Sequence, residues 1–278
     1  MKKIVKTAVI AIGGQGSRMA PITTVIPKQL VPIIDKPVIQ YVLEEVVSTK
    51  ISRIIFVGFR NRKTRLIIDY LKKSNQVSLK ELFNRIRVDI VYVGSNTLGD
   101  AIPIRAVKRY IKNEPFLVLW SDSFALAKDL RMHKLIEVYN KYQEPVISLL
   151  KIGKRETDLY AIARIKKIDS KVVVVEELLE KPGPRLAPSE YAAPNGFILD
   201  NRIFPYINKL KANNKGISVI DAINKYCKKN VVYGSIFNKP FFEAGNKLDV
   251  LISNIRLPLI RKDLKNIASK VKEYLKAY

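Results

Sequence analysis

A short glycine-rich segment near the N-terminus carries residues that could bind phosphate. The run Gly13-Gly14-Gln15-Gly16-Ser17-Arg18 directly follows an apolar stretch. Glycines let a backbone approach an anion closely and present N–H donors to it, and arginine offers a planar set of donors that suits phosphate oxygens. Lys28, ten residues after Arg18, adds a more mobile positive charge. The combination predicts a polyphosphate site, although the glycine run taken alone is also compatible with an ordinary turn.

This segment differs from two common nucleotide-binding motifs. A Walker A loop ends in Gly-Lys-Ser or Gly-Lys-Thr, and the dinucleotide fingerprint reads GxGxxG; the chain contains neither. Prolines follow the glycines at positions 21, 27, 32 and 37, where both motifs would have a helix. The pattern therefore indicates a loop that is stiffened by proline and carries two cations.

One carboxylate is expected at the same edge of the fold. Residues 7–12 and 116–120 are apolar runs typical of strands buried on both faces of a parallel sheet. The glycine segment follows the first run, and Asp122 follows the second. Ligands of open α/β sheets bind beyond the carboxyl ends of the strands, so we expect Asp122 to lie near the glycines. A turn-forming role for Asp122 is the alternative.

The apolar pattern predicts an α/β fold for the first half of the chain. Strand-like runs alternate with helical periodicity, which favours βαβ units and a Rossmann-like, open, mainly parallel sheet flanked by helices. The expected strands are 7–12, 53–57, 88–93, 116–120 and 145–150, and the expected helices are 38–49, 62–73, 100–111 and 130–142.

The second half of the chain has a different pattern. Short strand-like segments at 161–165, 172–176 and 196–199 predict a smaller β-rich region built onto the sheet, and helices are expected at 218–228, 247–255 and 261–275. We therefore expect a single domain over residues 1–278, with a nucleotide-binding part at 1–150, a β-rich part at 151–245 and C-terminal helices at 246–278.

The composition favours a cytoplasmic protein. No apolar run of the 278 residues reaches the roughly 18 residues that a membrane span needs, so we expect no membrane partner. The basic N-terminus lacks the apolar stretch of a signal peptide. Cys227 is the single cysteine, which excludes an intrachain disulfide and fits a reducing compartment.

The formal charge of +25 is compatible with several functions. It would attract polyanions, which leaves open a nucleic-acid-binding protein, an enzyme with anionic substrates, or simply a lysine-rich surface. A lysine-rich chain with one cysteine is also typical of hyperthermophiles and predicts a thermophilic protein. The basic residues are scattered, and no RNP, KH or zinc-finger spacing is present, so we do not expect nucleic acid as the main partner.

The glycine segment belongs to a longer motif that points to a family. Residues 13–21 read GGQGSRMAP, and residues 27–42 read PKQLVPIIDKPVIQYV. This block resembles the signature of sugar-1-phosphate nucleotidyltransferases, above all of bacterial-type UTP–glucose-1-phosphate uridylyltransferases (UDP-glucose pyrophosphorylases); glucose-1-phosphate thymidylyltransferases are near relatives. Shorter matches follow in the family's order at 120–122 (WSD), 180–182 (EKP) and 245–248 (GNKL).

The resemblance implies a reaction and its catalytic residues. The phosphate of a sugar-1-phosphate attacks the α-phosphorus of an NTP, UTP in the nearest relatives, and pyrophosphate leaves. Arg18 would hold the leaving phosphates, Lys28 would bridge the triphosphate, and Lys181 would bind the sugar's phosphate. Asp122 would bind the cofactor Mg²⁺, with Glu243 at the position of the family's second metal-binding Asp.

The resemblance also implies two sets of binding contacts. The nucleotide contacts would be Gly13, Gly14, Gln15, Gly16, Ser17, Leu98 and Gly99. The sugar contacts would be Tyr160, Ala161, Glu180, Lys181, Asn195 and Gly196, which makes the β-rich part at 151–245 the expected sugar-binding part. Two simpler interpretations stay open: Lys28 as a surface lysine of its loop, and residues 180–182 as an exposed turn.

Four of the departures from the family's pattern affect the expected base, sugar and metal positions. Tyr92 and Thr97 alter the segment that reads the base, Ala161 replaces a common glycine, and Glu243 replaces an aspartate. These changes leave the nucleobase and the sugar open, and they allow a paralogue that binds or senses a nucleotide sugar with weak or lost activity. The family further implies a homodimer or homotetramer.

Overall fold

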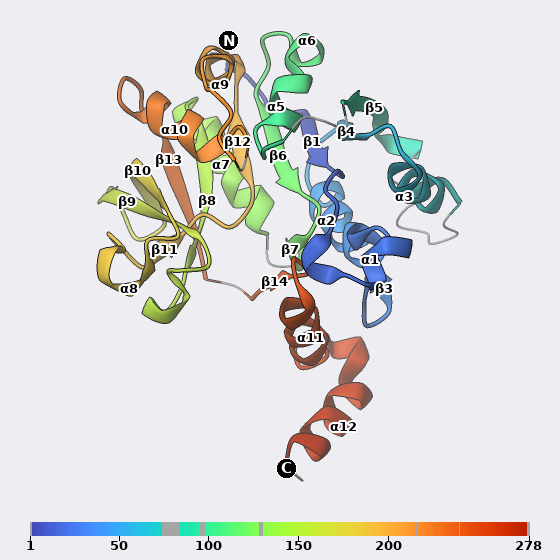
Figure 1. Ribbon diagram of the computed structural model, residues 1–278. Coiled ribbons are helices and arrows are strands. Elements are labelled where there is room, and N and C mark those ends of the chain that lie inside the picture. Colours follow the sequence, from blue (N-terminus) through green and yellow to red (C-terminus); the bar gives the residue numbers. More distant parts are fainter. Residues whose placement is uncertain are drawn as a thin grey trace.

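The computed structural model describes residues 2–73, 84–94, 98–127, 130–214, 216–238 and 240–276. The strands of its main sheet are β1 (Thr7–Ala11), β4 (Arg53–Phe59), β5 (Arg87–Val93), β6 (Phe116–Trp120), β8 (Val146–Lys151), β9 (Ala161–Lys167), β10 (Val172–Glu180), β11 (Tyr191–Ala192), β12 (Phe197–Leu199) and β13 (Tyr233–Phe237). They form one ten-stranded sheet in the order β11-β9-β10-β13-β8-β12-β6-β1-β4-β5 (Figure 1).

Four neighbouring strands at one end of the sheet are parallel. β1 pairs with β4 and β6, and β4 pairs with β5. All five residues of β1 are buried, as expected where both faces of a parallel sheet are covered. The carboxyl ends of β1 and β6 meet at one edge, where Ala11 pairs with Trp120. The α/β fold with a large sheet is therefore confirmed.

The other strands continue the same sheet with mostly antiparallel pairs. β12 lies antiparallel between β6 and β8, and β10 is antiparallel to both β9 and β13. Only β8 and β13 are parallel among the pairs described in this half. The β-rich region expected after residue 150 is thus continuous with the main sheet.

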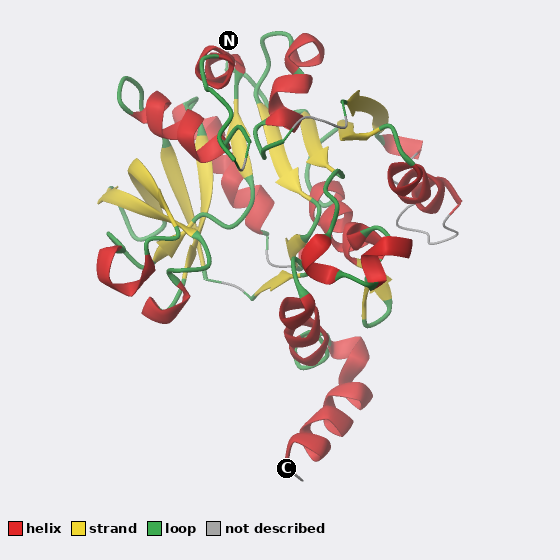
Figure 2. Ribbon diagram, viewed as in Figure 1, coloured by secondary structure: helices red, strands yellow, loops and turns green. Residues whose placement is uncertain are grey.

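Helices cover both faces of the sheet (Figure 2). They are α1 (Ile22–Val25), α2 (Val38–Val47), α3 (Arg62–Lys73), α5 (Ile102–Ala106), α6 (Lys108–Ile111), α7 (Arg131–Tyr142), α8 (Gly183–Leu186), α9 (Phe204–Asn208), α10 (Val219–Cys227), α11 (Lys247–Arg256) and α12 (Lys265–Lys276). Ile10 and Phe56 pack with α2, α3 and α7, whereas Val9 and Ile55 pack with α5, α9 and α10. This division follows from the alternation of side chains along a strand.

Two short ribbons lie outside the main sheet. One pairs β2 (Pro32–Ile33) with β3 (Lys36–Pro37), and the other pairs β7 (Ser123–Ala125) with β14 (Phe241–Glu243). Strands of two or three residues are too short to show a period, and the sequence pattern did not predict them. The second ribbon is important for the site because it places residue 243 beside residue 123.

The helical prediction missed the short helices α1, α8 and α9, and two expected helices differ in their course. Residues 100–111 form two short helices, α5 and α6, and nothing in the structure explains the break at Val107. The expected helix at 261–275 begins with a 3-10 turn at Lys262–Leu264 and continues as α12, which extends with α11 away from the sheet (Figure 1). Across the described residues, no helix combines the length and the apolar character needed to cross a membrane.

Candidate active site

The glycine segment lies at the end of β1, and two side chains donate hydrogen bonds to its backbone. Gln29 is 1% exposed, and its Nε2 donates to the carbonyl oxygens of Ile12 (3.2 Å) and Gly13 (3.1 Å). Thr23 donates its hydroxyl to the Gly16 oxygen at 2.6 Å. The sequence interpretation missed both supporting side chains, because a side-chain bond to a distant backbone oxygen leaves no local pattern. They keep the loop's shape while Gly14, Gln15 and Ser17 stay exposed.

Lys28 and Asp122 form an ion pair at this edge. Lys28 Nζ lies 2.5 Å from Asp122 Oδ2, and the two side chains are 16% and 22% exposed. Lys28 also lies against Gly14, where an added Cβ would be 3.6 Å from its Cε. Burial opposes ionisation of Asp122, but the charge and hydrogen bond of Lys28 outweigh it, so the pKa of Asp122 lies below its ordinary value. The structure therefore brings together two predicted catalytic residues that are far apart in sequence.

A cavity of about 350 Å³ opens beside this pair. The predicted residues among its lining are Arg18, Asp122, Tyr160, Ala161, Glu180, Lys181 and Glu243. Asp100, Asn246 and Asp249 line it too, although the sequence analysis assigned them no role. The volume lies within the range of about 300–1,000 Å³ that is usual for small-molecule sites.

One antiparallel strand pair builds the far side of the cavity. Ala161 in β9 pairs with Glu180 in β10, and Lys181 N donates to Tyr160 O at 3.1 Å. Lys181 has a φ of 47°, a left-handed conformation that is uncommon for a residue other than glycine. The pairing explains why two sequence segments, 160–161 and 180–181, meet at one wall.

Glu243 reaches the cavity from the short β7–β14 ribbon. It pairs with Ser123, and Ala244 N donates to Asp122 O at 2.8 Å, so Glu243 and Asp122 occupy adjoining positions. Tyr160 donates its hydroxyl to Glu243 Oε2. Burial raises the pKa of Glu243 to about 7, although the hydrogen bond from Tyr160 acts against this rise. This carboxyl group therefore changes its charge near neutral pH.

The donor set suits a hard divalent cation that is shared with a substrate. Mg²⁺ prefers oxygen ligands and is commonly held by one or two carboxylates together with substrate phosphates. Asp122 and Glu243 provide two such carboxylates. Within the described parts of the chain, no group of three or more His, Cys, Asp or Glu side chains is arranged to hold a metal. The residues fit a cation that arrives with phosphate oxygens better than one enclosed by protein ligands alone.

Leu98 and Gly99 do not line this cavity. Leu98 is 60% exposed, and Gly99 packs against a neighbouring loop, where an added Cβ would lie 2.2 Å from Ile217 N. With a φ of 114° as well, this position accepts only glycine. Tyr92 is 45% exposed, and the Arg60 guanidinium lies over the Tyr92 ring, 5.0 Å from the ring centroid. Thr97 lies outside the described residues.

Asn195 and Gly196 lie behind the cavity wall. The Asn195 side chain is fully buried and bonds to Trp120 and Ser123. Gly196 faces Met132, whose Cε would be 3.2 Å from an added Cβ. These two predicted sugar contacts therefore differ from Tyr160 and Glu180, which line the cavity directly.

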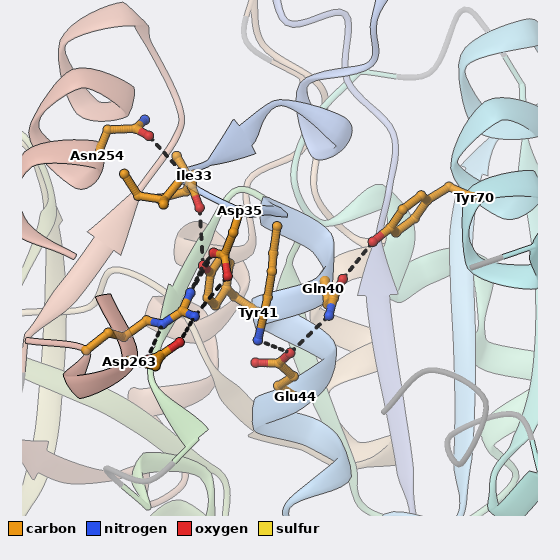
Figure 3. Close-up of polar contacts among 11 residues, drawn as sticks. Ile33, Asp35, Gln40, Tyr41, Glu44, Tyr70, Asn254 and Asp263 are labelled. Atoms are coloured by element: carbon orange, nitrogen blue, oxygen red, sulfur yellow. Dashed lines mark hydrogen bonds and ion pairs between the residues drawn. The ribbon is translucent and has the colours of Figure 1, made fainter. Parts of the chain in front are cut away.

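Side chains of the C-terminal segment form hydrogen bonds with the loop that follows Lys28 (Figure 3). Arg261 donates to Asp35 Oδ1 at 2.6 Å and Oδ2 at 2.9 Å, and also to the Tyr41 hydroxyl at 2.7 Å. Asn254 Oδ1 accepts from Ile34 N at 2.8 Å. Ile34 has a φ of 59°, which is strained for a β-branched residue, so this turn depends on contacts from outside it.

Comparison with known proteins identifies similar chains. The family model described as "Nucleotidyl transferase" matches residues 7–246. A UTP–glucose-1-phosphate uridylyltransferase of Staphylococcus epidermidis is 30% identical over 286 residues, covering 95% of this chain and 97% of that protein. The UTP–glucose-1-phosphate uridylyltransferase YngB of Bacillus subtilis is 27% identical over 278 residues, covering 96% of this chain and 94% of that protein.

Solved structures show the same fold. A UDP-glucose pyrophosphorylase complexed with UDP-glucose matches with a TM-score of 0.84 and 25% identity, covering 93% of this chain and 100% of that one. A UTP-bound UGPase from Acinetobacter baumannii has a TM-score of 0.79 at 23% identity, covering 96% and 98%.

Proposed function

The chain belongs to the nucleotidyl transferase family, and we propose that it transfers the uridylyl group of UTP to glucose-1-phosphate, giving UDP-glucose and pyrophosphate. Two relatives are named for this activity, and the similarity extends over nearly the whole length of each. The observation that carries the proposal is the cavity itself, which is lined by Arg18, Asp122, Glu180 and Lys181, with Lys28 paired to Asp122 beside it. Such a site can neutralise two phosphorylated substrates at once.

The reaction requires little covalent chemistry from the protein. An oxygen of the sugar phosphate forms a bond to the α-phosphorus, while the bond from that phosphorus to the bridging oxygen of the β-phosphate breaks. Both reactants are anions, so catalysis depends on positioning and on neutralising charge. Lys181 would hold the attacking phosphate, Lys28 the α-phosphate, and Arg18 the leaving pyrophosphate.

Asp122 and Glu243 would hold Mg²⁺. When bound, the cation would neutralise phosphate oxygens at the α-phosphorus. The ionised state of Asp122 suits this role. Glu243 would have to share its Tyr160 hydrogen bond or give it up.

The sugar side would use residues that the β9–β10 pair holds together. Glu180 and the backbone at Tyr160 and Ala161 line the cavity next to Lys181, where they can accept or donate hydrogen bonds to sugar hydroxyls. On the nucleotide side, the exposed backbone of residues 13–17 would lie along the nucleoside and triphosphate. Leu98 and Gly99 do not line the cavity, so they would contact only a base that extends beyond it.

A pyrophosphate-release assay tests the proposal. Each NTP is paired with each of several sugar-1-phosphates in the presence of Mg²⁺, at moderate and at elevated temperature. UTP with glucose-1-phosphate should give the highest turnover. Absence of pyrophosphate release from every pair would refute the transfer reaction, and preference for another pair would correct only the substrates.

The environment of Glu243 favours a second candidate, a protein that senses a nucleotide sugar. Its carboxyl group accepts the Tyr160 hydroxyl and has a pKa raised to about 7 by burial, so a cation must compete for it. Calorimetry with UDP-glucose distinguishes the two functions. Tight binding without turnover of any substrate pair would identify the sensor.

The remaining expectations concern the whole chain. We infer one domain for residues 1–278 because a single sheet runs through both halves, and we place the protein in the cytoplasm. We also propose a homodimer or homotetramer, which fits the exposed apolar side chains Leu248, Leu251, Tyr274 and Leu275 on α11 and α12. Light scattering coupled to size-exclusion chromatography measures that state directly.

A further inference from the structure

The buried side chain of Asn195 bonds to both ends of the turn that carries Asp122, and these hydrogen bonds to Trp120 and Ser123 form a clamp. Asn195 Oδ1 accepts from Trp120 N at 3.0 Å, and its Nδ2 donates to Trp120 O at 2.8 Å. The same Nδ2 donates to Ser123 Oγ at 2.8 Å and lies 3.3 Å from Ser123 O. Trp120 and Ser123 are the residues on either side of Ser121–Asp122. One amide group therefore spans both ends of the turn.

The register of β12 against β6 explains why a side chain, rather than a backbone group, bonds to Trp120. β12 and β6 are antiparallel with Phe197 opposite Val118, so Asn195 is the residue that would stand opposite Trp120. The regular pairing ends before that point, because Gly196 has a φ of 95° and turns the backbone away. The amide of Asn195 takes over the donor and acceptor that a continuing strand would have offered to Trp120.

A buried ion pair holds the clamp. Arg131 Nη1 donates to Asn195 O at 2.9 Å, and the rest of its guanidinium donates to Glu45 Oε1 at 2.9 Å and Oε2 at 2.7 Å. The Arg131 and Glu45 side chains are 1% and 2% exposed. Glu45 also accepts from Ala125 N at 3.0 Å, in the strand that leaves the turn. Both the clamp and the strand after Asp122 are thus fixed to one rigid pair.

We propose that Asn195 is a positioning residue that sets the Asp122 carboxylate for the cation–triphosphate complex. This proposal rests on the proposed function, and it differs from a direct sugar contact by Asn195. Residues that orient a metal ligand matter because a small displacement of the ligand weakens the cation's contacts with it. The test must therefore measure coupling between cation and nucleotide.

The experiment compares UTP binding by calorimetry in EDTA and in Mg²⁺. The ratio of the two dissociation constants reports how much the cation strengthens UTP binding. For Asn195→Ala we expect this Mg²⁺ enhancement to fall by about 10-fold or more, within the range of about 10–100-fold seen for residues behind metal ligands. UTP affinity in EDTA should stay within about twofold of the parent, because no triphosphate contact is removed.

Asn224→Ala is the matched control. Asn224 in α10 makes the same kind of clamp, accepting from Leu178 N and donating to Leu178 O at 2.8 Å each; Leu178 lies in β10, which runs to Glu180 on the cavity wall, rather than on the Asp122 turn. It should keep the parent's Mg²⁺ enhancement even if it loses similar stability. If Asn195→Ala does not fold, Ser123→Ala removes one acceptor of the clamp and should reduce the enhancement by about two- to tenfold, the size of one hydrogen bond.

Three results would overturn the inference. They are an unchanged Mg²⁺ enhancement in the variant that folds, an equal loss in Asn224→Ala, or weaker glucose-1-phosphate binding with the enhancement intact. Failure of the proposed function looks different, because the unaltered protein would then bind no UTP or release no pyrophosphate.

Discussion

Lys28 and Asp122 each have a protein partner in the structure and a substrate partner in the proposed reaction. Their side chains meet at 2.5 Å, and both are largely buried. When substrates bind, a phosphate would replace Asp122 as the partner of Lys28, and the cation would replace Lys28 as the partner of Asp122. The local charge stays balanced through this exchange, which avoids leaving either group uncompensated at a poorly solvated position.

Replacing Lys28 by alanine tests this role. We expect Lys28→Ala to lower kcat by about 100-fold or more, the usual cost of removing one donor to developing charge. Lys36→Ala is the control, because Lys36 belongs to the same proline-rich loop but pairs with Glu44 at 2.8 Å. It should stay within about twofold of the parent. Steady-state pyrophosphate release measures both variants, and equal losses in the two would contradict a specific role for Lys28.

Single residues could be placed at one site where a family motif includes them. Arg18 from the long motif, and Asp122, Glu180 and Lys181 from the shorter matches, all line the cavity, while their chemical roles stay predictions. Asn195 was not predictable in this way, because an asparagine can contact a sugar or its own backbone equally well. Its partners depend on the register of β12 against β6, which no local pattern encodes.

At the scale of elements, the C-terminal segment stabilises the loop between Lys28 and α2. Arg261 donates to both carboxylate oxygens of Asp35 and to the hydroxyl of Tyr41 in α2. Figure 3 labels Asp35 and Tyr41. Partial burial opposes ionisation of Asp35, but the hydrogen bonds from Arg261 and Tyr41 outweigh it and hold the pKa of Asp35 below its ordinary value of 3.8. The contact should therefore stabilise the folded chain in a pH-dependent way.

Asp35→Asn should reveal that dependence in thermal melts from pH 2.5 to 7. A pKa lowered by folding adds stability that is fully present above the unfolded value and is lost as the pH falls through the folded value. The side chain is 37% exposed, so we expect a loss of about 1 kcal/mol or less at pH 7 that disappears in strong acid. Asp263→Asn, which removes the more exposed partner of Arg261, should cost less. A loss that grows toward low pH would contradict this account.

Elements were predictable from the sequence in proportion to their length and burial. The apolar run of β1 and the periodicity of α3 matched the structure closely. β13 was missed because Gly234 and Ser235 interrupt its apolar pattern. The β7–β14 ribbon was missed because three-residue strands have no measurable period, although it joins the two carboxylates of the site.

For the whole molecule, a reversal of strand order accounts for the position of the site, because β4 and β5 lie on one side of β1 and β6 lies on the other. β6 is parallel to β1 on one side and antiparallel to β12 on the other. Asp122 follows β6, so it lies at the carboxyl edge of the sheet where the strand order reverses. An open α/β sheet offers a crevice at such a reversal, and the proposed reaction would bring its two substrates together there.

The charge of +25 leads to the last prediction, which separates the enzyme from a nucleic-acid-binding protein. Scattered surface charges act through the solvent and are screened beyond about 10 Å at 0.1 M salt, whereas contacts inside a cavity are screened much less. Raising KCl from 0.05 to 0.2 M should weaken any binding to duplex DNA by about 1,000-fold or more if several phosphates are contacted.

UTP binding in Mg²⁺ should fall far less over the same range, by about 10-fold at most, since Lys28 and Asp122 are largely shielded from solvent. Lys272→Glu, on the exposed side of α12, should reduce DNA binding further without changing UTP affinity. Filter binding and calorimetry on the same preparations measure the two affinities. A parallel decline of both affinities would show that the surface charge rather than the cavity determines what this protein binds. Salt-resistant DNA binding would contradict the prediction too, because it would require DNA contacts other than scattered surface charge.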